Sequence, residues 1–168
     1  MLQGLKTEIV GANHANRGRT RPIPLDDVTI EREPARDARA IPTGLNKPFI
    51  VLMDELTASG GDLFAATVQD NARGILVGWR TMGAGGNVSA WEAGSYSLGT
   101  MTVTESLMIR KDMVRTKEYP AAPYVENIGV YPDVWADYMT RDNLATGGKA
   151  YVDVFVKALV DYMHVVGR

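Results

Sequence analysis

The hydrophobic and polar positions between Lys47 and Gly86 fall into blocks that predict a strand, a helix and a second strand. Phe49–Met53 is a short, unbroken apolar run, typical of a strand in a sheet that is covered on both faces. Residues 57–61 are small and can turn the chain sharply. Ile75–Gly78 then resumes as a buried strand. This order of elements indicates an α/β fold.

The predicted helix lies between this turn and Gly74, because glycine commonly follows the last residue of a helix. Asp62 falls in the first turn of the helix, where a negative charge favours the positive end of the helix dipole. The face that we expect the helix to bury is formed by Leu63, Phe64, Ala66, Thr67 and Val68.

The second half of the chain begins with short apolar segments that are separated by glycines. These segments predict strands at residues 91–94, 96–98, 101–104, 106–110 and 128–130. Residues 150–166 have helical spacing instead, which predicts a terminal helix. Its buried face is expected to consist of Tyr151, Phe155, Ala158, Leu159, Tyr162 and Val166.

The first 46 residues have a different character. Residues 1–10 fit a short helix or strand, whereas residues 13–46 are polar, rich in arginine and interrupted by four prolines. Such a stretch has too few apolar residues to form a core of its own. We therefore interpret residues 1–46 as a polar N-terminal connection or arm, and residues 47–168 as the domain proper.

The composition of the chain argues against several kinds of site and partner. The chain has 168 residues, a formal net charge of −2 and no cysteine. It therefore has no disulfide framework and no cysteine metal site, and neither its charge nor a motif points to nucleic acid. No stretch is long enough to span a membrane. The glycine-rich loop at residues 80–88 lacks a P-loop lysine, which makes a phosphate site there a weak interpretation. We expect no cofactor and no metal.

Ser59 has two interpretations. On the first, Ser59 caps the helix, since Ser-x-x-Asp before Leu63 is close to a capping box. On the second, the serine is a nucleophile on a strand-to-helix turn, and the N–H of Gly60 faces a developing oxyanion. The local pattern alone leaves both open.

Two ordered blocks of the sequence resemble the C-terminal processing (tail-specific) serine peptidases. The first block is TASGGDLFAATVQDNARGILVGWRTMGAGGNV, and the second is YVENIGVYPD, residues 124–133. The pair is most similar to the branch that contains the chlamydial protease-like activity factor. The resemblance covers residues 48–134 and implies a crotonase/Clp-protease-like spiral of strands with crossover helices, here as a partial domain.

The resemblance also implies roles for individual residues. The lysine base of the tail-specific branch aligns with Ala84, so the sequence follows the Ser-His-Glu branch instead. Ser59 is then the nucleophile, Glu126 the carboxylate that orients the histidine, and Gly60 the oxyanion donor. The loop that includes Gly83, Ala84 and Gly85 would border the substrate groove. Without the matching block, Glu126 reads as a solvated loop acid.

The catalytic histidine is not identified in this chain. His14 lies in what reads as a polar loop, and His164 lies in the last turn of the terminal helix. In the resembled branch the histidine lies far upstream of the serine. We therefore expect residues 47–168 to be the C-terminal part of a peptidase catalytic domain, inactive without its N-terminal half.

The function expected from this resemblance is hydrolysis of peptide bonds through an acyl-enzyme on Ser59. The expected partners are a peptide or protein substrate, the missing N-terminal half of the same polypeptide and, in a homo-oligomer, a second copy. A periplasmic or secreted parent protein fits this activity. The alternative is a non-catalytic peptide-binding or assembly module with the same fold. An acyl-CoA-handling crotonase relative would share the architecture but not these motifs.

Overall fold

A computed structural model describes residues 2–23, 39, 44–45, 47–114 and 122–167. The chain divides into two compact units, Met1–Asn46 and Lys47–Arg168. The described helices are α1 (Leu2–His14), α2 (Gly60–Asp70), α3 (Arg141–Ala145) and α4 (Lys149–Val166). The described strands are β1 (Ile50–Met53), β2 (Ile75–Gly78), β3 (Asn87–Glu92), β4 (Thr100–Ser106), β5 (Ile109–Val114), β6 (Ala122–Tyr124) and β7 (Val134–Trp135).

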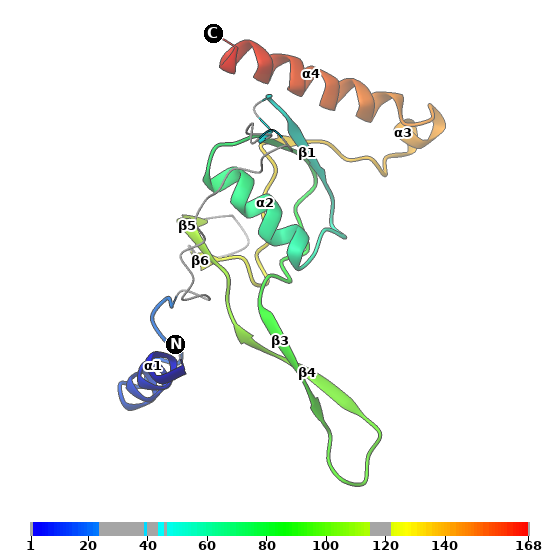
Figure 1. The fold of residues 1–168 in the computed structure, drawn as a ribbon. Coiled ribbons are helices and arrows are strands. Elements are labelled where there is room, and N and C mark those ends of the chain that lie inside the picture. Colours follow the sequence, from blue (N-terminus) through cyan, green and yellow to red (C-terminus); the bar gives the residue numbers. More distant parts are fainter. Residues whose placement is uncertain (1, 24–38, 40–43, 46, 115–121, 168) are drawn as a thin grey trace. The chain divides into compact units, whose positions relative to one another are not determined.

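Helix α1 is the regular element of the first unit (Figure 1). It confirms the helical alternative for residues 1–10 and continues to His14, so the prediction that His14 lies in a loop is wrong. The helix ends where Asn16 takes a positive φ of 49°, a conformation that asparagine tolerates better than most residues. Residues 24–38, 40–43 and 46 of the predicted polar connection lie outside the described residues.

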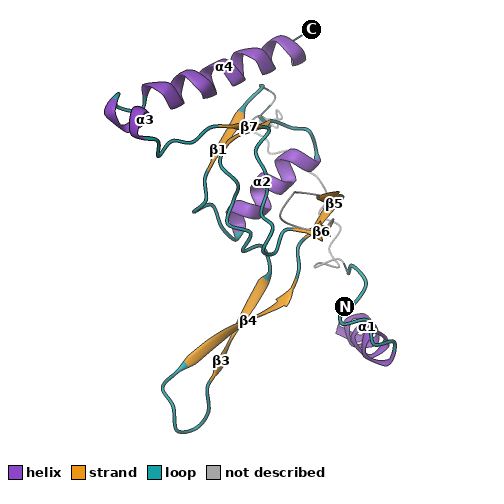
Figure 2. Cartoon of the chain, turned by 180° about the vertical axis from the view of Figure 1, so that it is seen from behind, coloured by secondary structure: helices purple, strands orange, loops and turns teal. Residues whose placement is uncertain are grey.

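The second unit is built on a parallel three-stranded sheet in the order β1-β2-β7. Helix α2 covers one face, where Ala65, Ala66 and Val68 pack with Met53 and Leu76. Helix α4 covers the opposite face, as Figure 2 shows from behind. Leu76 and Val77 are fully buried, and burial of each such side chain stabilises the fold by about 1.5–3 kcal/mol. The predicted α/β fold is confirmed, and β1 and β2 lie where the sequence predicts them.

Helix α2 lies in the predicted place, and its predicted buried face is confirmed for Ala66 and Val68 but not for Leu63, Phe64 and Thr67. Its buried residues are Asp62, Ala65, Ala66 and Val68. Leu63 and Phe64 are more than half exposed, and Thr67 is exposed as well. The reason is that the Asp62 carboxylate is drawn inward by hydrogen bonds from the glycine-rich loop. The small residues Ala65 and Ala66 lie on the buried side of the helix together with Asp62.

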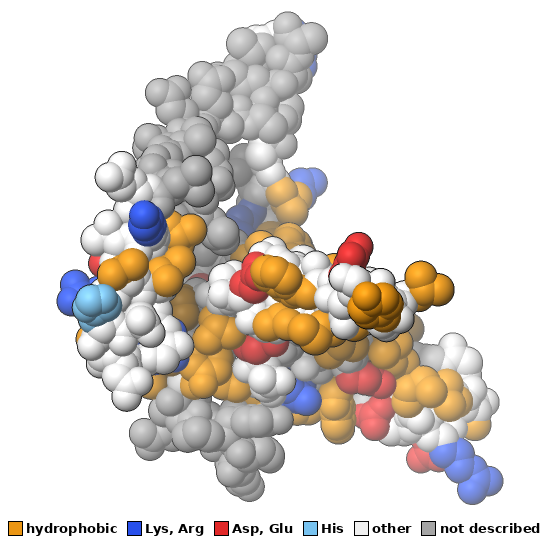
Figure 3. Space-filling model, turned by 90° about the horizontal axis from the view of Figure 1, so that it is seen from below, with side chains coloured by type: hydrophobic (Ala, Val, Ile, Leu, Met, Phe, Trp, Pro, Cys, Tyr) orange, Lys and Arg blue, Asp and Glu red, His pale blue; other side chains and the backbone are white. Residues whose placement is uncertain are grey.

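The segment after the glycine-rich loop is an antiparallel hairpin of β3 and β4, with Trp91 opposite Met101. Residues 96–98 were expected to be a strand, but they belong to the connection between β3 and β4. Turn hydrogen bonds close that connection, from Ala93 N to Gly99 O and from Ser97 N to Gly94 O. Figure 3 shows hydrophobic side chains at the surface seen from below. The exposed hydrophobic residues of this hairpin include Val88, Trp91, Met101 and Val103.

Two further strand predictions fail for local reasons. The expected strand 106–110 is interrupted, because β4 ends at Ser106 and β5 begins at Ile109. Residues 128–130 form part of a tight turn, since the N–H groups of Ile128 and Gly129 both donate to the carbonyl of Val125. Gly129 has a φ of 75°, which suits such a turn and not a strand.

Helix α4 is confirmed, with Ala158 buried and Tyr151 and Phe155 packed beside it against the sheet. Val166 is wrongly included in the predicted face, since it is 45% exposed. Helix α3 was not predicted; it is a single short turn whose N-cap, Thr140, accepts a hydrogen bond from Asn143 N at 3.2 Å. Among the described residues, no helix is both long and apolar enough to cross a membrane.

Candidate active site

The turn that leads from β1 into α2 is held by its own polar side chains. Asp54 Oδ1 accepts hydrogen bonds from Leu56 N at 2.9 Å and from Thr57 Oγ1 at 3.2 Å. Asp54 N in turn donates to Thr57 Oγ1 at 3.1 Å. These bonds fix the chain before Ser59, as short polar side chains commonly do in turns.

Ser59 has an uncommon backbone conformation, with φ at 54° and ψ at −115°. Residues other than glycine rarely adopt positive φ, and such a conformation typically costs about 1–3 kcal/mol. The Ser59 side chain makes no capping hydrogen bond and the residue is exposed. The helix-cap interpretation of Ser59 is therefore wrong. Its hydroxyl is presented at a strained strand-to-helix turn.

Gly60 is the first residue of α2. The first N–H groups of a helix have no partner within the helix and lie at its positive end. Among the described residues, the N–H of Gly60 finds no hydrogen-bond acceptor. This amide can therefore donate to a negatively charged or polarised oxygen beside Ser59.

Asp62 lies in the first turn of α2, as predicted, but its carboxylate faces the glycine-rich loop. The residue is fully buried. Oδ1 accepts from Gly83 N at 3.1 Å and Oδ2 accepts from Ala84 N at 3.1 Å. The hydroxyl of Thr81 also donates to Oδ1. The beginning of α2 and the glycine-rich loop are therefore joined through one carboxylate.

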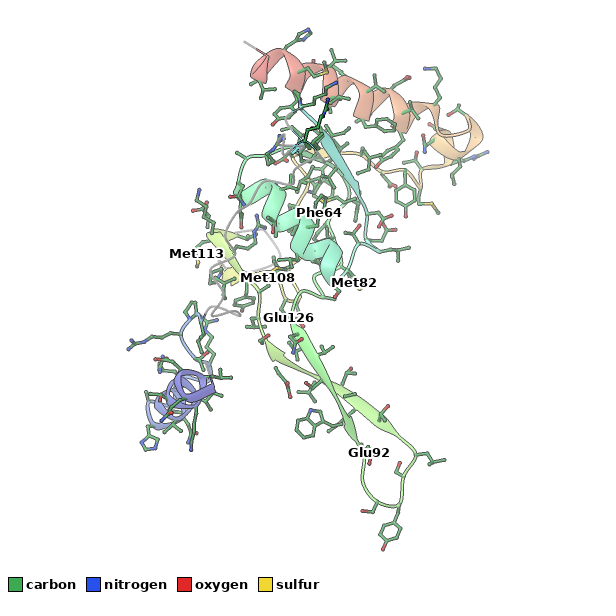
Figure 4. All side chains as sticks on the ribbon, viewed as in Figure 1. Phe64, Met82, Glu92, Met108, Met113 and Glu126 are labelled. Atoms are coloured by element: carbon green, nitrogen blue, oxygen red, sulfur yellow. The ribbon has the colours of Figure 1, made fainter. Side chains whose placement is uncertain are left out.

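Glu126 lies where the glycine-rich loop runs into β3 (Figure 4). Its Oε2 accepts from Gly86 N at 2.7 Å, and its Oε1 accepts from Thr104 Oγ1 at 3.1 Å. The neighbouring Asn127 N donates to Gly83 O at 2.7 Å. Glu126 is only partly buried, and each carboxylate oxygen can accept more than one hydrogen bond.

Two glycines of the loop are required by close packing. A Cβ on Gly83 would lie 2.7 Å from Gly129 N, and a Cβ on Gly86 would lie 2.4 Å from Thr104 Cγ2. The amides of Gly83 and Ala84 both donate to Asp62. Any contact of a ligand with these two residues must therefore use other atoms than their N–H groups.

Among the described residues, hydrogen bonds connect the segments that carry the predicted site residues, but they do not join Ser59, Glu126 and a histidine to one another. Met82 N donates to Thr57 O at 2.8 Å, so the Ser59 turn contacts the glycine-rich loop directly, and the loop contacts Glu126. Within the described part of the chain, however, no hydrogen bond joins Ser59 to Glu126 or either of them to a histidine. His14 ends α1 in the first unit, and His164 lies exposed in the last turn of α4.

A second polar network holds the other end of α2. Arg110 Nε donates to both carboxylate oxygens of Asp70 at 3.0 Å, and Arg110 Nη2 donates to Asp70 Oδ1 at 2.6 Å. Burial alone would raise the pKa of Asp70, but the hydrogen bonds from Arg110 and from Lys111 N, together with the nearby positive charges, lower it. Gln69 Nε2 donates to Asp133 Oδ1 at 2.9 Å, which ties the helix end to the segment before β7.

Sequence reasoning missed Thr81 and the inward role of Asp62. Asp62 was visible as an acid three residues after Ser59, but its partners lie 19–22 residues further along the chain, and local patterns carry no signal for such a contact. Among the described residues, no group of three or more His, Asp or Glu side chains could hold a metal ion.

Comparison with known families identifies a family that matches most of the chain. The pattern of peptidase family S41 matches residues 7–134, which is more than half of the chain. A protein of Chlamydia pneumoniae is 35% identical over 115 residues, which are 68% of this chain and 17% of that protein. The chloroplastic carboxyl-terminal-processing peptidase 3 of Arabidopsis thaliana is 33% identical over 87 residues, which are 52% of this chain and 15% of that protein.

The fold also matches a solved structure, that of mature CPAF. The TM-score is 0.67 at 25% sequence identity, and the match covers 96% of this chain and 28% of that one. The chain therefore spans less than a third of the length of each of these proteins.

Proposed function

The chain belongs to peptidase family S41, as its two motif blocks predicted, and from this premise we propose that it carries the serine half of an endopeptidase active site. The family supports peptidase chemistry with a serine-type fold. The proposal adds which residues act and how. It concerns a chain that spans a small part of its relatives' length, so the activity is that of the full-length protein.

In this proposal Ser59 is the nucleophile. A histidine from outside these 168 residues takes the proton of the Ser59 hydroxyl while the oxygen attacks the scissile carbonyl. Glu126 holds the imidazole and stabilises its charged form. The N–H of Gly60 donates to the tetrahedral oxyanion. The histidine then protonates the leaving amine, and water hydrolyses the acyl-enzyme.

The observation that carries the proposal is the conformation of Ser59. A serine that only capped a helix would have an ordinary extended backbone and would accept a hydrogen bond from the helix. Ser59 has neither, because its φ is 54° and its side chain makes no cap bond. Strain of this kind at a strand-to-helix turn is typical of a nucleophile whose hydroxyl must be exposed.

The substrate in this proposal is a peptide or protein that lies along the glycine-rich loop. A Cβ on Gly83 or Gly85 would meet Gly129 N at 2.7 Å or Met108 Cε at 2.9 Å, so these glycines serve packing within the domain. Ala84 between them carries only a methyl group, which allows a peptide backbone to approach the loop. Because Asp62 already binds the N–H groups of Gly83 and Ala84, and Asn127 N donates to Gly83 O, their contribution is shape and the carbonyl oxygen of Ala84. Gly60 is left as the amide donor beside Ser59.

A second candidate is a non-catalytic peptide-binding or assembly module. One observation favours it: both carboxylate oxygens of Glu126 already accept hydrogen bonds, from Gly86 N and Thr104 Oγ1. Those bonds alone would explain a glutamate at this position, with no histidine to orient.

The substitution Ser59→Ala in the full-length protein separates the two candidates. We expect peptide hydrolysis to be abolished and the melting temperature to be nearly unchanged, because the Ser59 side chain makes no cap bond that the substitution could remove. Removing a true cap would cost about 0.5–2 kcal/mol of stability and spare the chemistry. Full turnover at a lowered melting temperature would therefore refute the nucleophile assignment.

A further inference from the structure

We infer that Asp62 is a positioning residue, which sets the glycine-rich loop and the Glu126 segment against the Ser59 turn. The inference rests on the proposed function, since it assigns Asp62 a part in that same site. In this account Asp62 touches neither the reacting atoms nor the substrate. It acts through the loop residues that border the groove and through the Glu126 segment.

The charge of Asp62 is the first argument. The residue is fully buried, and burial of a carboxylate is costly unless hydrogen bonds satisfy it. No lysine or arginine among the described residues pairs with it; three donors of the glycine-rich loop and the positive end of α2 compensate instead. An alanine would fill the same helix position without any desolvation cost, so packing alone does not explain an acid here.

The geometry of the carboxylate is the second argument. Each of its two oxygens accepts one of two consecutive amides, Gly83 N and Ala84 N, both at 3.1 Å. Two bonds to neighbouring amides fix the peptide unit between them, and so fix the direction in which the loop runs past Ser59. Ser59 lies three residues before Asp62 and one helical turn away, so the anchor and the nucleophile belong to the same turn.

Thr81 connects Asp62 to the segment that follows Glu126. It is fully buried, and its hydroxyl donates to Asp62, which leaves its oxygen to accept from Val130 N at 2.7 Å. Thr81 N also donates to Val130 O at 3.0 Å. The residues that lead from Glu126 to Val130 are thereby held in register with the beginning of α2. One carboxylate thus fixes both segments that flank the proposed nucleophile.

The substitution Asp62→Asn tests the inference in the full-length protein. Asparagine has the same shape, but its amide group would oppose one loop N–H, so one of the two amide bonds is lost. We expect kcat/KM for a peptide to fall about 100-fold, because small misplacements at a site cost that much. Labelling of Ser59 by a small fluorophosphonate does not need the groove and should fall much less than kcat/KM, because the carbonyl oxygen of asparagine can still accept from Thr81 and so keep the Glu126 segment in place.

Matched variants separate positioning from stability. Thr81→Ser keeps the hydroxyl that links Asp62 to Val130 and should retain peptide turnover, whereas Thr81→Val removes it and should lose turnover as Asp62→Asn does. Arg110→Met destabilises the far end of α2 and should lower the melting temperature while leaving the ratio of turnover to labelling unchanged. All rates are compared well below each variant's melting temperature.

The outcomes distinguish this inference from the proposed function. If wild type neither hydrolyses peptide nor is labelled at Ser59, the proposed function itself fails. If wild type is active and Asp62→Asn keeps wild-type kcat/KM, the positioning role is refuted. A parallel loss of labelling and turnover in Asp62→Asn also refutes it, because the Ser59 turn and not the loop would then have changed.

Discussion

Replacing Arg110 by methionine would show how strongly the second polar network holds α2. The side chain of Arg110 is 6% exposed and that of Asp70 is 17% exposed. Arg110 donates to Asp70 through Nε and Nη2, and to Gln69 Oε1 through Nη2 at 2.9 Å. Methionine keeps an apolar chain in the same space, but it removes every one of these donors.

The expected loss of stability depends on the interactions that Asp70 keeps in the variant. Breaking a buried ion pair by removing one partner costs about 3–5 kcal/mol. Asp70 keeps the hydrogen bond from Lys111 N at 3.1 Å, and water reaches part of its carboxylate. We therefore expect a loss of about 2–4 kcal/mol in the free energy of unfolding. For a chain of this size that lowers the melting temperature by roughly 4–16 °C.

The loss should depend on pH in a defined direction. The pKa of Asp70 is lowered from its usual value of 3.8. A carboxyl group whose folded-state pKa is lowered stabilises the fold fully above its unfolded-state pKa, and less as pH falls through the folded-state pKa. The difference in melting temperature between wild type and Arg110→Met should therefore be complete at pH 7 and shrink below about pH 4.

The assay is thermal unfolding, followed by circular dichroism across this pH range. The matched control is Lys149→Met, which makes the same change of charge in an exposed pair with Asp153; such pairs are worth about 0.3–0.5 kcal/mol. If Arg110→Met lowers the melting temperature no more than Lys149→Met, or if its effect is the same at pH 3 and pH 7, the reasoning is refuted.

Three further predictions concern the site, the sheet and the isolated chain. In the full-length protein Glu126→Gln should lower turnover by orders of magnitude. The pH–rate profile of the wild type should rise near roughly pH 6 to 7. A wild-type profile that rises only at alkaline pH, together with an active Glu126→Gln variant, would indicate a lysine base. Gly78→Ala should unfold the domain, because its Cβ would lie 2.0 Å from Met53 O. The control Gly94→Ala is also at positive φ but in open space, and it should lower the free energy of unfolding by about 1–3 kcal/mol. Equal melting temperatures of the two variants would contradict the steric explanation. The 168-residue chain alone should fold at least in part and hydrolyse no peptide, because an unactivated serine hydroxyl is a poor nucleophile; casein cleavage that disappears in His14→Ala would make His14 the base.

The sequence was informative where local patterns decide the structure. The strands at Ile50–Met53 and Ile75–Gly78, the helix between them and the terminal helix follow from apolar runs and helical spacing. Residues 96–98 do not form the predicted strand, because these residues with strand propensity lie in a hairpin connection where the chain reverses. Propensity alone does not distinguish a strand from an exposed connection.

The candidate site, too, could be predicted from the sequence only in part. Ser59 and Glu126 were found through motif blocks, and the helix-cap alternative for Ser59 was open until its φ and its missing cap bond were known. Asp62 looked like an ordinary acid at a helix start. Its bonds to Thr81 and to the glycine-rich loop arise from tertiary contacts, so sequence spacing carries no signal for them. The roles of Ser59 and Glu126 stay predictions.

Fluorophosphonate labelling of the full-length protein, followed by mass spectrometry of its peptides, tests the central claim most directly. The account predicts one modified residue, Ser59, and no labelling in a folded Ser59→Ala variant. A folded, peptide-cleaving protein that is labelled at another residue, or one that is not labelled at all, would contradict it.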